Sequence, residues 1–579
     1  MKNKLKYTVK GELSHIRKNL RIPITVSEKE ISRIALWGIV SASIVYILGW
    51  FINVMDVDAA QYAAMTMEML KRGDYLSFTD YGKDYLDKPP LIFWVSGLSM
   101  SIFGTNNIAY RIPAFLVTLF GLYSTYRFAF LFYSKQTSLL SALILATLQA
   151  TFLINHDVRT DTNLMAFYIF SLWQLAAYLR DGKWKNLLLG FIGVGFTMLA
   201  KGPIGLIAPA LAIFPHLMLK RKWKSVFNPA WIVGLIVTAI VLLPMSYGLY
   251  QQFDLHPEKI VNGETGVSGL RFFYWTQSFG RITGESVWDN GASPFFLSHS
   301  TMWAFAPWSL FLVLGLFDKI KSVVSYLRGR SDTREFITLF GFILPFMALS
   351  ASHYQLPHYA FVVYPLGAII TADYIIKTFY ELRPAWSRAL YIFQIILLYL
   401  VLLLIFGLVW FPFPENNFLA LAIFAVVLGL FTWVVAFLKS NHKLILACTI
   451  LIVGVNAILN TYFYPNILKF QAGSELGQKA KDNGALEGRF YSYQTGLPHT
   501  LNFYSGILVQ ETQDFDFLVT KKNCWVYTDE NLLGKFQKAR PDLQIIARND
   551  DFPVSMLKGK FLNPVTRESV LEKRILIRL

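Results

Sequence analysis

Residues 388–411 read RALYIFQIILLYLVLLLIFGLVWF, a stretch in which Arg388 is the only charged residue. About 20 consecutive apolar residues are enough for an α-helix to cross the hydrocarbon core of a bilayer. Comparable apolar runs recur along the chain and give thirteen candidate spans, at residues 34–54, 109–132, 137–155, 162–179, 185–200, 203–219, 230–250, 297–316, 335–351, 358–377, 388–411, 417–438 and 443–463. The sequence therefore predicts an α-helical polytopic membrane protein.

The composition and the placing of the charges support this class. Of the 579 residues, 54% are hydrophobic and 16% are charged, which is too apolar for an ordinary soluble protein. The formal net charge is +17, but the Lys and Arg residues cluster in short loops between apolar runs rather than in a basic folded module. This positive-inside pattern is typical of membrane proteins, so we expect the partner of the basic loops to be the lipid bilayer and not a nucleic acid.

The basic clusters also assign the two sides of the membrane. They fall before the first span and then after every second span, at residues 1–33, 180–185, 220–224, 319–334, 377–388 and 439–443. Because basic loops stay on the cytoplasmic side, residues 1–33 are predicted to be a cytoplasmic N-terminus and residues 34–464 a transmembrane domain. The opposite, periplasm-like face then receives two long loops, at about 55–108 and 251–296, and the tail 465–579.

The tail has a different kind of sequence from the rest of the chain. Strand-like runs at 489–493, 515–520, 524–527 and 543–547 alternate with helix-like runs at 474–481 and 531–540. This alternation predicts a small α/β domain outside the membrane.

The first long loop contains a short amphipathic helix that carries Asp58 and Tyr62 and ends near Gly73. Asp58 stands where an N-cap residue is expected, and Gln61 follows three residues later, which is a capping-box arrangement. On this segment alone, helix capping explains Asp58 better than chemistry does.

The same loop continues with Tyr85-Leu-Asp-Lys-Pro-Pro-Leu91, a stiff, charged corner at the membrane surface. Lys88 could hold a lipid phosphate as a point charge, and Asp87 could pair with it or bind a metal ion. A snorkelling lysine beside a helix that begins at the two prolines explains the same residues without a function.

Further ionisable residues stand on the same predicted face. The segment His156-Asp157-Val-Arg159-Thr-Asp161 places four ionisable groups at a membrane edge, which is costly unless they face water or a polar cavity. Other candidates from distant parts of the chain are Lys201, Arg271, Gln277, Arg281, Glu285, His353 and His358. Their shared face predicts one polar cavity at the membrane surface.

The absence of several common motifs limits the reactions that this sequence is expected to catalyse. The sequence has no GxxxxGK[ST] phosphate loop, which argues against direct use of ATP, and no HExxH or Ser-His-Asp motif stands out. A cavity with acids and phosphate-holding cations suits a donor that is itself a lipid phosphate. Two alternatives remain: a transporter or flippase, although the chain shows no internal repeat, and a non-catalytic envelope-assembly protein whose tail is a binding module.

The chain also carries an ordered set of short motifs: Asp58-x-x-x-Tyr62-Ala63, Glu68-Met69-Leu70, Tyr85-x-Asp87-Lys88-Pro89-Pro90-Leu91, Arg111-x-Pro113, Arg159-Thr160-Asp161, Lys201-Gly202-Pro203-x-Gly205 and Leu356-Pro357-His358-Tyr359. Together these motifs resemble the bacterial GT-C glycosyltransferases related to protein O-mannosyltransferases, and among them the lipid A aminoarabinose transferase family. The resemblance covers most of the chain.

The resemblance implies a GT-C fold of about 13 transmembrane helices with an extracytoplasmic α/β domain, in the bacterial inner membrane. It implies transfer, with inversion, of a sugar from a polyprenyl (undecaprenyl) phosphate donor to an envelope acceptor such as lipid A, another glycolipid, a glycan or a protein. Asp58 matches the catalytic acid of the outer loop and would act as general base, and Asp161 matches a second active-site acid. The residues implied to bind substrate are Tyr62, Tyr85, Lys88, Arg159, Lys201, Arg281, His358 and Tyr359.

The one cofactor that the resemblance suggests is a divalent metal ion. Asp87 stands where a carboxylate can take part in metal binding, and Glu285 stands near the place of a family histidine in the second loop. The sequence departs from the family pattern at Ala59, where an acid is frequent, and at Gln61, where an arginine is frequent. If the acceptor group were a phosphate, it would already be ionised and Asp58 would not need to act as a base.

Overall fold

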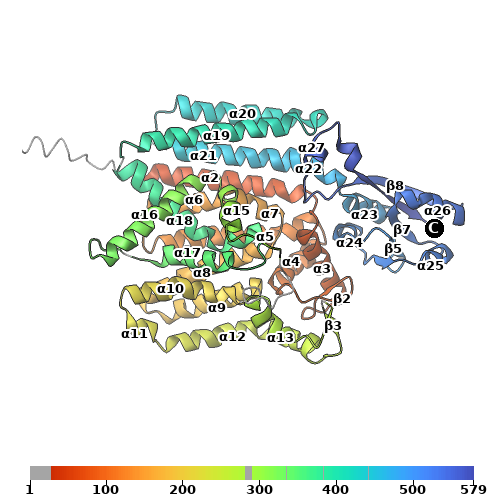
Figure 1. Cartoon of the computed structure of the whole chain (residues 1–579), viewed down its shortest axis with the longest axis horizontal. Coiled ribbons are helices and arrows are strands. Elements are labelled where there is room, and N and C mark those ends of the chain that lie inside the picture. Colours follow the sequence, from red (N-terminus) through yellow and green to blue (C-terminus); the bar gives the residue numbers. More distant parts are fainter. Residues whose placement is uncertain (1–27, 262, 281–289, 334, 383, 441) are drawn as a thin grey trace, which may run out of the picture.

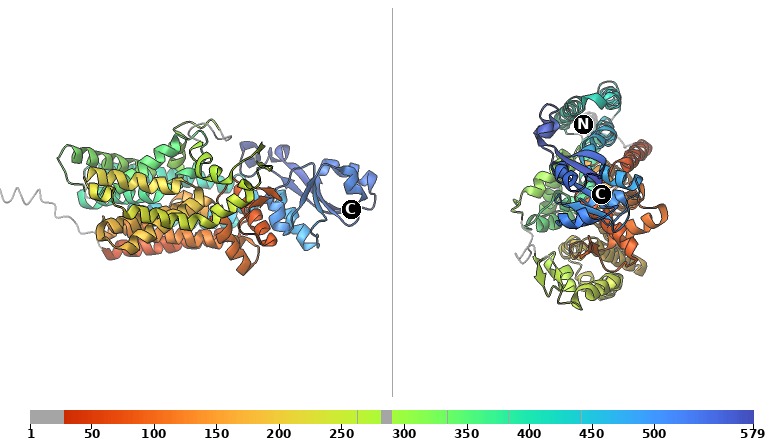
Figure 2. Two further views of the ribbon diagram at one scale, coloured as in Figure 1. Left: turned by 90° about the horizontal axis from the view of Figure 1, so that it is seen from below. Right: turned by 90° about the vertical axis from the view of Figure 1, so that its right-hand side faces the viewer.

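The structure is a computed structural model that describes residues 28–261, 263–280, 290–333, 335–382, 384–440 and 442–579. It consists of a long bundle of helices with a smaller C-terminal domain packed on one end of the bundle (Figure 1). The helices run along the long axis of the molecule, and the C-terminal domain extends beyond them in the side view (Figure 2).

The bundle contains the helices α2 (Glu28–Leu48), α5 (Asn107–Ala129), α6 (Lys135–Ala146), α7 (Gln149–His156), α8 (Thr160–Asp181), α9 (Trp184–Lys201), α10 (Ile204–Leu219), α12 (Ala230–Leu249), α16 (Ser309–Leu327), α17 (Ile337–Ser350), α18 (Tyr364–Ile376), α19 (Ser387–Trp410), α20 (Phe418–Ala436) and α21 (Lys443–Ile458). In the part of the chain that the structure describes, 7 helices are long and apolar enough to cross a membrane, or up to 8 with the bent pair α6–α7. The multi-pass membrane class is therefore confirmed. The predicted count of thirteen spans is not confirmed, because helices such as α10 and α17, with 16 and 14 residues, are shorter than a full span.

Burial follows the layers of the bundle. Helix α18 lies at the centre, and all of its residues are buried. The outer helices α19 and α20 instead expose large apolar side chains, for example Leu404 and Phe418, which are 72% and 86% exposed. Contiguous apolar surface of this kind marks contact with another apolar phase, here the lipid.

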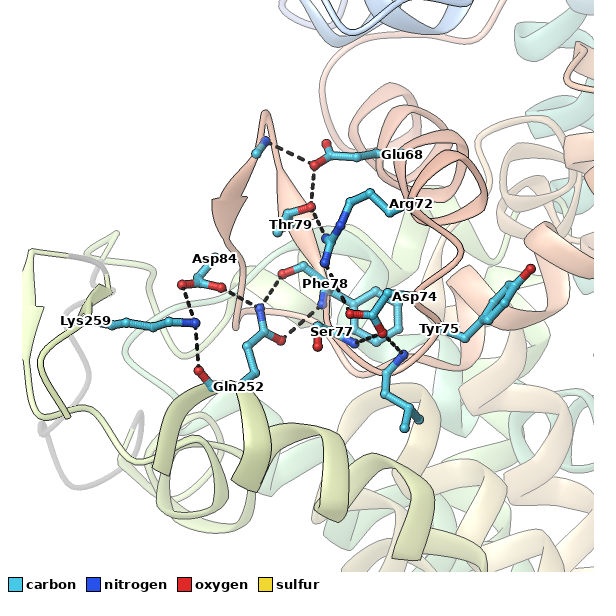
Figure 3. A network of polar contacts seen from close by, with 12 residues as sticks. Glu68, Arg72, Asp74, Tyr75, Ser77, Phe78, Thr79, Asp84, Gln252 and Lys259 are labelled. Atoms are coloured by element: carbon cyan, nitrogen blue, oxygen red, sulfur yellow. Dashed lines mark hydrogen bonds and ion pairs between the residues drawn. The ribbon is translucent and has the colours of Figure 1, made fainter. Parts of the chain in front are cut away.

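The first outer loop folds into three short elements at the end of the bundle that carries the C-terminal domain. They are α3 (Asp58–Arg72), a hairpin of β1 (Thr79–Asp80) and β2 (Lys83–Asp84), and α4 (Leu91–Phe103). Gly73 ends α3 with a φ of 66°, a left-handed conformation that glycine adopts without strain. Glu68 of α3 accepts hydrogen bonds from Thr79 Oγ1 and from the backbone N–H of Gly82, which fixes the hairpin on the helix (Figure 3).

The second outer loop contains η2 (Tyr250–Asp254), β3 (Ile260–Val261), β4 (Glu264–Thr265), α13 (Gly269–Arg271), η3 (Phe272–Thr276) and α15 (Phe296–Ala304). Gln252 joins it to the first loop, because its Nε2 donates to the carbonyl oxygen of Phe78 and to Asp84 Oδ1, both at 2.8 Å (Figure 3). Lys259 adds an ion pair to Asp84 at 3.1 Å. The two loops therefore form one connected layer over the bundle end.

The C-terminal domain is a five-stranded mixed sheet with helices on both faces. Its elements are α23 (Ala472–Asp482), β5 (Phe490–Tyr493), α24 (His499–Ser505), β6 (Gln510–Thr512), α25 (Phe515–Thr520), β7 (Trp525–Asp529), α26 (Leu533–Ala539), β8 (Gln544–Asp551), α27 (Gly559–Leu562) and β9 (Glu572–Arg578). The strand order is β6-β5-β7-β9-β8, with parallel pairs on both sides of β5 and antiparallel pairs on both sides of β9. The predicted α/β class of this domain is confirmed.

One predicted strand of the domain is wrong. Residues 515–520 form helix α25, because the carboxylate of Asp514 accepts from the backbone N–H of Phe517 and caps the helix. Its apolar side chains, among them the fully buried Leu518, pack against the sheet, so a short and mostly apolar segment fits either structure.

Candidate active site

A buried arginine shapes the segment between α2 and α3. Arg111 of α5 is completely buried, and its guanidinium donates to the carbonyl oxygens of Ile52 (2.6 Å), Asn53 (3.2 Å) and Trp50 (3.3 Å). It also donates to the carbonyl oxygen of His156 at 2.8 Å. The planar guanidinium has five N–H donors, so one side chain satisfies several backbone acceptors and joins two turns of the chain.

Asp58 is the first residue of α3, but its carboxylate does not cap this helix. The N-cap is Val57, which makes no side-chain capping bond, and the Gln61 side chain donates to Asp80 at 2.7 Å. Asp58 forms an ion pair with Arg159. The predicted capping box is therefore wrong, because the Arg159 guanidinium takes the carboxylate that the box would need.

Arg159 stands between α7 and α8, where the chain changes direction. Its Nε donates to Asp157 at 2.7 Å, while another nitrogen contacts Asp58. Burial by itself would lower the pKa of Arg159, but the Asp157 and Asp58 carboxylates outweigh it and raise that pKa above its ordinary value. Arg159 is thus a permanent cation that orients two acids.

A second ion pair lies deeper. Asp161, in the first turn of α8, is 1% exposed, and Lys201 Nζ reaches it at 2.5 Å from the last turn of α9. His358 Nε2 lies 3.7 Å from the other carboxylate oxygen. The Lys201 ammonium also stands 4.0 Å from the centre of the Tyr359 ring, a cation–π distance. A buried carboxylate is tolerated here because it has cationic and hydrogen-bonding neighbours.

Lys88 approaches from the start of α4. It forms an ion pair with Asp87, its neighbour in sequence. Gln277 of the second outer loop donates to the backbone carbonyl oxygen of Asp87 and lies 3.5 Å from its carboxylate. The two outer loops therefore meet at this ion pair.

A cavity with a volume of about 200 Å³ lies between these groups. Its polar side carries Asp58, Lys88, Lys201, His358 and Tyr359. Its apolar wall comes from α8, α10, α17, the second outer loop and the turn after α17, through Leu164, Ile204, Ile207, Phe279, Ala348, Leu349 and Leu356. A ligand with an anionic head and an apolar chain matches this lining, because cations and apolar side chains border the same cavity.

The structure places the predicted site residues in three groups. The five on the polar side of the cavity are those just named, and Arg159 and Asp161 each pair with one of them, Asp58 and Lys201. Tyr62 and Tyr85 pack edge-on against Phe93 of α4, with ring centres 6.0 and 6.4 Å away, and do not line the cavity. Arg281 and Glu285 lie outside the described residues.

The described side chains do not form a metal site. Among the residues that the structure describes, no group of three or more His, Cys, Asp or Glu side chains could hold a metal ion. Asp87 is engaged with Lys88, and its predicted partner Glu285 is outside the described ranges.

Sequence reasoning assigned no role to Arg111 or to the apolar wall. For Arg111 a signal existed, because an arginine near the end of an apolar run must find polar partners. For wall residues such as Ile204 there was none, since an apolar residue beside a cavity has the same pattern as one in the core.

The fold and the cavity now define a class of protein. Residues 87–247 match the sequence profile of the family described as dolichyl-phosphate-mannose-protein mannosyltransferase. The crystal structure of ArnT from Cupriavidus metallidurans in the apo state superposes with a TM-score of 0.70 and 16% identity, over 94% of this chain and 97% of that chain. ArnT from the same organism bound to undecaprenyl phosphate gives a TM-score of 0.71 over 96% and 98%. The chain therefore has the GT-C fold of ArnT.

Curated relatives are similar over a shorter stretch. A protein of Aquifex aeolicus described as uncharacterized is 28% identical over 317 residues, which are 54% of this chain and 58% of that protein. An undecaprenyl phosphate-alpha-4-amino-4-deoxy-L-arabinose arabinosyl transferase of Edwardsiella ictaluri is 26% identical over 339 residues, or 55% of each chain. The alignment thus spans little more than half the length of these relatives. The similarity to GT-C transferases near the aminoarabinose transferase family, inferred from the motifs, is confirmed.

Proposed function

We propose that the protein is a membrane glycosyltransferase that moves a sugar from a polyprenyl phosphate donor to an envelope acceptor, such as lipid A, another glycolipid, a glycan or a protein. The observation that carries the proposal is the lining of the cavity, which combines the cations Lys88 and Lys201 with the apolar wall. A lipid phosphate likewise combines an anionic head with an apolar chain. The names of the relatives make undecaprenyl phosphate the first carrier to test, and 4-amino-4-deoxy-L-arabinose the first sugar.

In the proposed reaction, an acceptor hydroxyl attacks the anomeric carbon from the side opposite the phosphate. The new carbon–oxygen bond forms as the bond to the phosphate oxygen breaks, so the configuration inverts and polyprenyl phosphate leaves with the bonding electrons. Asp58 takes the proton of the acceptor hydroxyl, and Arg159 holds the Asp58 carboxylate in orientation. Lys88 and Lys201 face the negative charge that grows on the leaving phosphate.

The proposal places this chemistry on the periplasmic face of the bacterial inner membrane, with the C-terminal domain periplasmic and the N-terminus cytoplasmic. Its support is the distribution of basic residues. Lys220, Arg221, Lys222 and Lys224 surround the start of α11 (Trp223–Val226), which lies at the end of the bundle away from the C-terminal domain (Figure 1). Because basic loops remain in the cytoplasm, the cavity end faces the periplasm.

The test compares envelope glycolipids and glycoproteins by mass spectrometry in cells with the intact gene, a deletion, and Asp58→Asn at matched expression. We expect one sugar increment to disappear in the deletion and to fall about a hundredfold or more in Asp58→Asn, since a positioned base contributes on the order of a hundred- to ten-thousandfold. Asp482→Asn, on the exposed side of α23, is the matched control and should retain the product.

The same spectra separate the alternatives. The mass of the missing increment identifies the sugar, and the molecule that lacks it identifies the acceptor. A deletion that changes the distribution of lipids but removes no covalent product would contradict the transferase proposal and favour a flippase. Full activity in Asp58→Asn would remove Asp58 from the mechanism while leaving the enzyme class intact.

A further inference from the structure

The C-terminal domain contacts the chain immediately before Asp58. Gln471, which is buried ahead of α23, accepts from the backbone N–H of Asp56 at 2.9 Å, and its Nε2 donates to the carbonyl oxygen of Val54 at 2.8 Å. Its side-chain amide thus pairs with residues 54 and 56 in the way that a neighbouring strand would. This leaves little freedom for the two residues that precede Val57 and Asp58.

Helix α24 of the same domain adds two contacts to this segment. Thr500 Oγ1 donates to Asp56 Oδ2 at 2.7 Å. The backbone N–H of Val54 donates to Tyr504 Oη at 2.6 Å, and that hydroxyl donates in turn to Asn107 at 2.7 Å. Residues 54 and 56 are therefore held by three side chains of the C-terminal domain.

A further contact of the C-terminal domain lies on the other side of Asp58. His499, the first residue of α24, donates to the Asp80 carboxylate at 3.0 Å and stacks on Tyr81 with a distance of 4.6 Å between ring centres. Asp80 also accepts from Gln61 Nε2, which stands on α3 three residues after Asp58. His499 therefore acts on α3 through Asp80 and Gln61.

We propose that the C-terminal domain positions Asp58 for the proposed reaction through a clamp of Gln471, Thr500 and His499, which hold the chain before and after Asp58. The inference rests on the proposed function, and these three are positioning residues that do not touch substrate. Arg111 already holds the carbonyl groups of Trp50, Ile52 and Asn53 from the membrane side. The clamp holds the residues that follow these carbonyl groups, and its contacts come from the C-terminal domain.

The purpose of such a clamp follows from the geometry that a general base needs. A base must stand within hydrogen-bond reach of the proton it takes. A displacement of about 1 Å by a distant change can reduce the rate on the order of a hundredfold. Loss of the clamp should lower kcat, while the affinity for the donor should stay the same, because Lys88 and Lys201 do not depend on these contacts.

The test uses the full-length protein in membranes, with the donor and acceptor that the mass spectra identify. We expect His499→Leu and Thr500→Val each to lower kcat about tenfold or more with less than a twofold change in the donor KM. His499→Gln keeps an N–H donor near the place of Nε2 and should restore most of kcat. Lys71→Ala is the matched control, because its exposed ion pair with Glu487, at 2.6 Å, joins the same two domains away from Asp58.

Hydrogen exchange on the purified full-length wild type and variants gives a second readout that needs no substrate. Backbone amides of residues 54–62 should exchange at least tenfold faster in His499→Leu and Thr500→Val, while those of α18 should not change. Unchanged exchange in this segment, or a higher donor KM with an unchanged kcat, would overturn the clamp. If wild-type protein makes no product, the proposed function fails, and faster exchange in the variants would then show only that these contacts hold residues 54–62 in place.

Discussion

At the residue scale, the acids in and around the cavity each form an ion pair with a cationic side chain. Asp58 and Asp157 share Arg159, Asp161 has Lys201, and Asp87 has Lys88. The Asp58–Arg159 pair joins α3 to the turn between α7 and α8, and the Asp161–Lys201 pair joins α8 to α9, whereas Asp87 and Lys88 are neighbours in sequence. The charges are therefore needed for the fold of this end as well as for the proposed chemistry, and the two roles can be separated by experiment.

The Asp161–Lys201 pair offers one such separation. Lys201→Met leaves the carboxylate of Asp161, which is 1% exposed, without its lysine, and breaking a buried pair from one side costs about 3–5 kcal/mol. We expect a clear drop in the thermal unfolding temperature of the detergent-purified protein. The double variant Lys201→Met/Asp161→Asn removes the buried charge and should recover most of the loss, although not the activity. Equal unfolding temperatures for the single and double variants would contradict this pairing.

The buried carboxyl group of Asp56 predicts that the stability of the fold depends on pH. Burial raises the pKa of Asp56 from an ordinary 3.8 to about 6, although hydrogen bonds from Thr500 act to lower it. An acid with a raised folded-state pKa stabilises the fold fully below pH 3.8, and the contribution is lost as the pH rises through about 6. The loss amounts to at most about 3 kcal/mol.

Asp56→Asn removes this titration and keeps an oxygen that accepts from Thr500. We therefore expect the variant to unfold at a higher temperature than wild type at pH 7.5 and to lose this advantage at pH 4.5. Asp482→Asn, at an exposed position, should follow wild type at both pH values. A constant difference between Asp56→Asn and wild type across this range would show that Asp56 does not titrate there.

Part of this residue-scale picture could be predicted from the sequence. Charged residues at the ends of apolar runs had to find polar partners, so their gathering on one face followed from physical cost. Their partners could not be predicted: the pairing of Asp58 with Arg159 joins residues 101 positions apart. Helix capping was the better local explanation for Asp58, and it failed because a tertiary ion pair replaced it.

At the element scale, the site depends on how closely α9 and α10 approach. A Cβ atom on Gly205 would stand 2.5 Å from the backbone nitrogen of Met198 and 2.6 Å from the carbonyl carbon of Thr197. These two helices carry Lys201 and Ile204 into the cavity lining. The glycine of the Lys201-Gly202-Pro203-x-Gly205 motif thus has a packing reason that the sequence did not reveal.

Gly205→Ala should force α9 and α10 apart. Overpacking of this kind costs about 1–3 kcal/mol, and the displacement of Lys201 should reduce transfer as well. Gly429→Ala on α20 is the matched control, since a Cβ there would meet no atom within 4 Å. We expect a lower unfolding temperature for Gly205→Ala and an unchanged or slightly higher one for Gly429→Ala. The same unfolding temperature in both variants would contradict the close approach.

The elements themselves were predictable where they are long and uniform. The apolar runs of α19 and α20 could only be membrane helices, because their length and composition exclude other structures. Short elements were ambiguous: residues 515–520 became a helix through the cap at Asp514, and α4 lies inside what was predicted as the first outer loop. The bend of 52° between α6 and α7 likewise lies inside one predicted span.

At the scale of the whole molecule, the bundle has two unlike ends. One carries the cavity, the outer loops and the C-terminal domain, and the other carries α11 and the connections between long helices (Figure 1). The basic clusters predict that this second end lies on the cytoplasmic side of the membrane. This remains a prediction until the sides of the membrane are measured.

Labelling with a membrane-impermeant maleimide makes that measurement. Lys522 lies on an exposed loop of the C-terminal domain, and Lys224 lies on α11 at the other end of the bundle. In cells with a permeabilised outer membrane and an intact inner membrane, we expect Lys522→Cys to react and Lys224→Cys to react only after the inner membrane is disrupted. Wild-type protein is the control, because its two cysteines, Cys448 and Cys524, are buried and should react little. The opposite pattern would show that the molecule is inverted in the membrane, with the cavity on the cytoplasmic side, and would contradict the proposed periplasmic reaction.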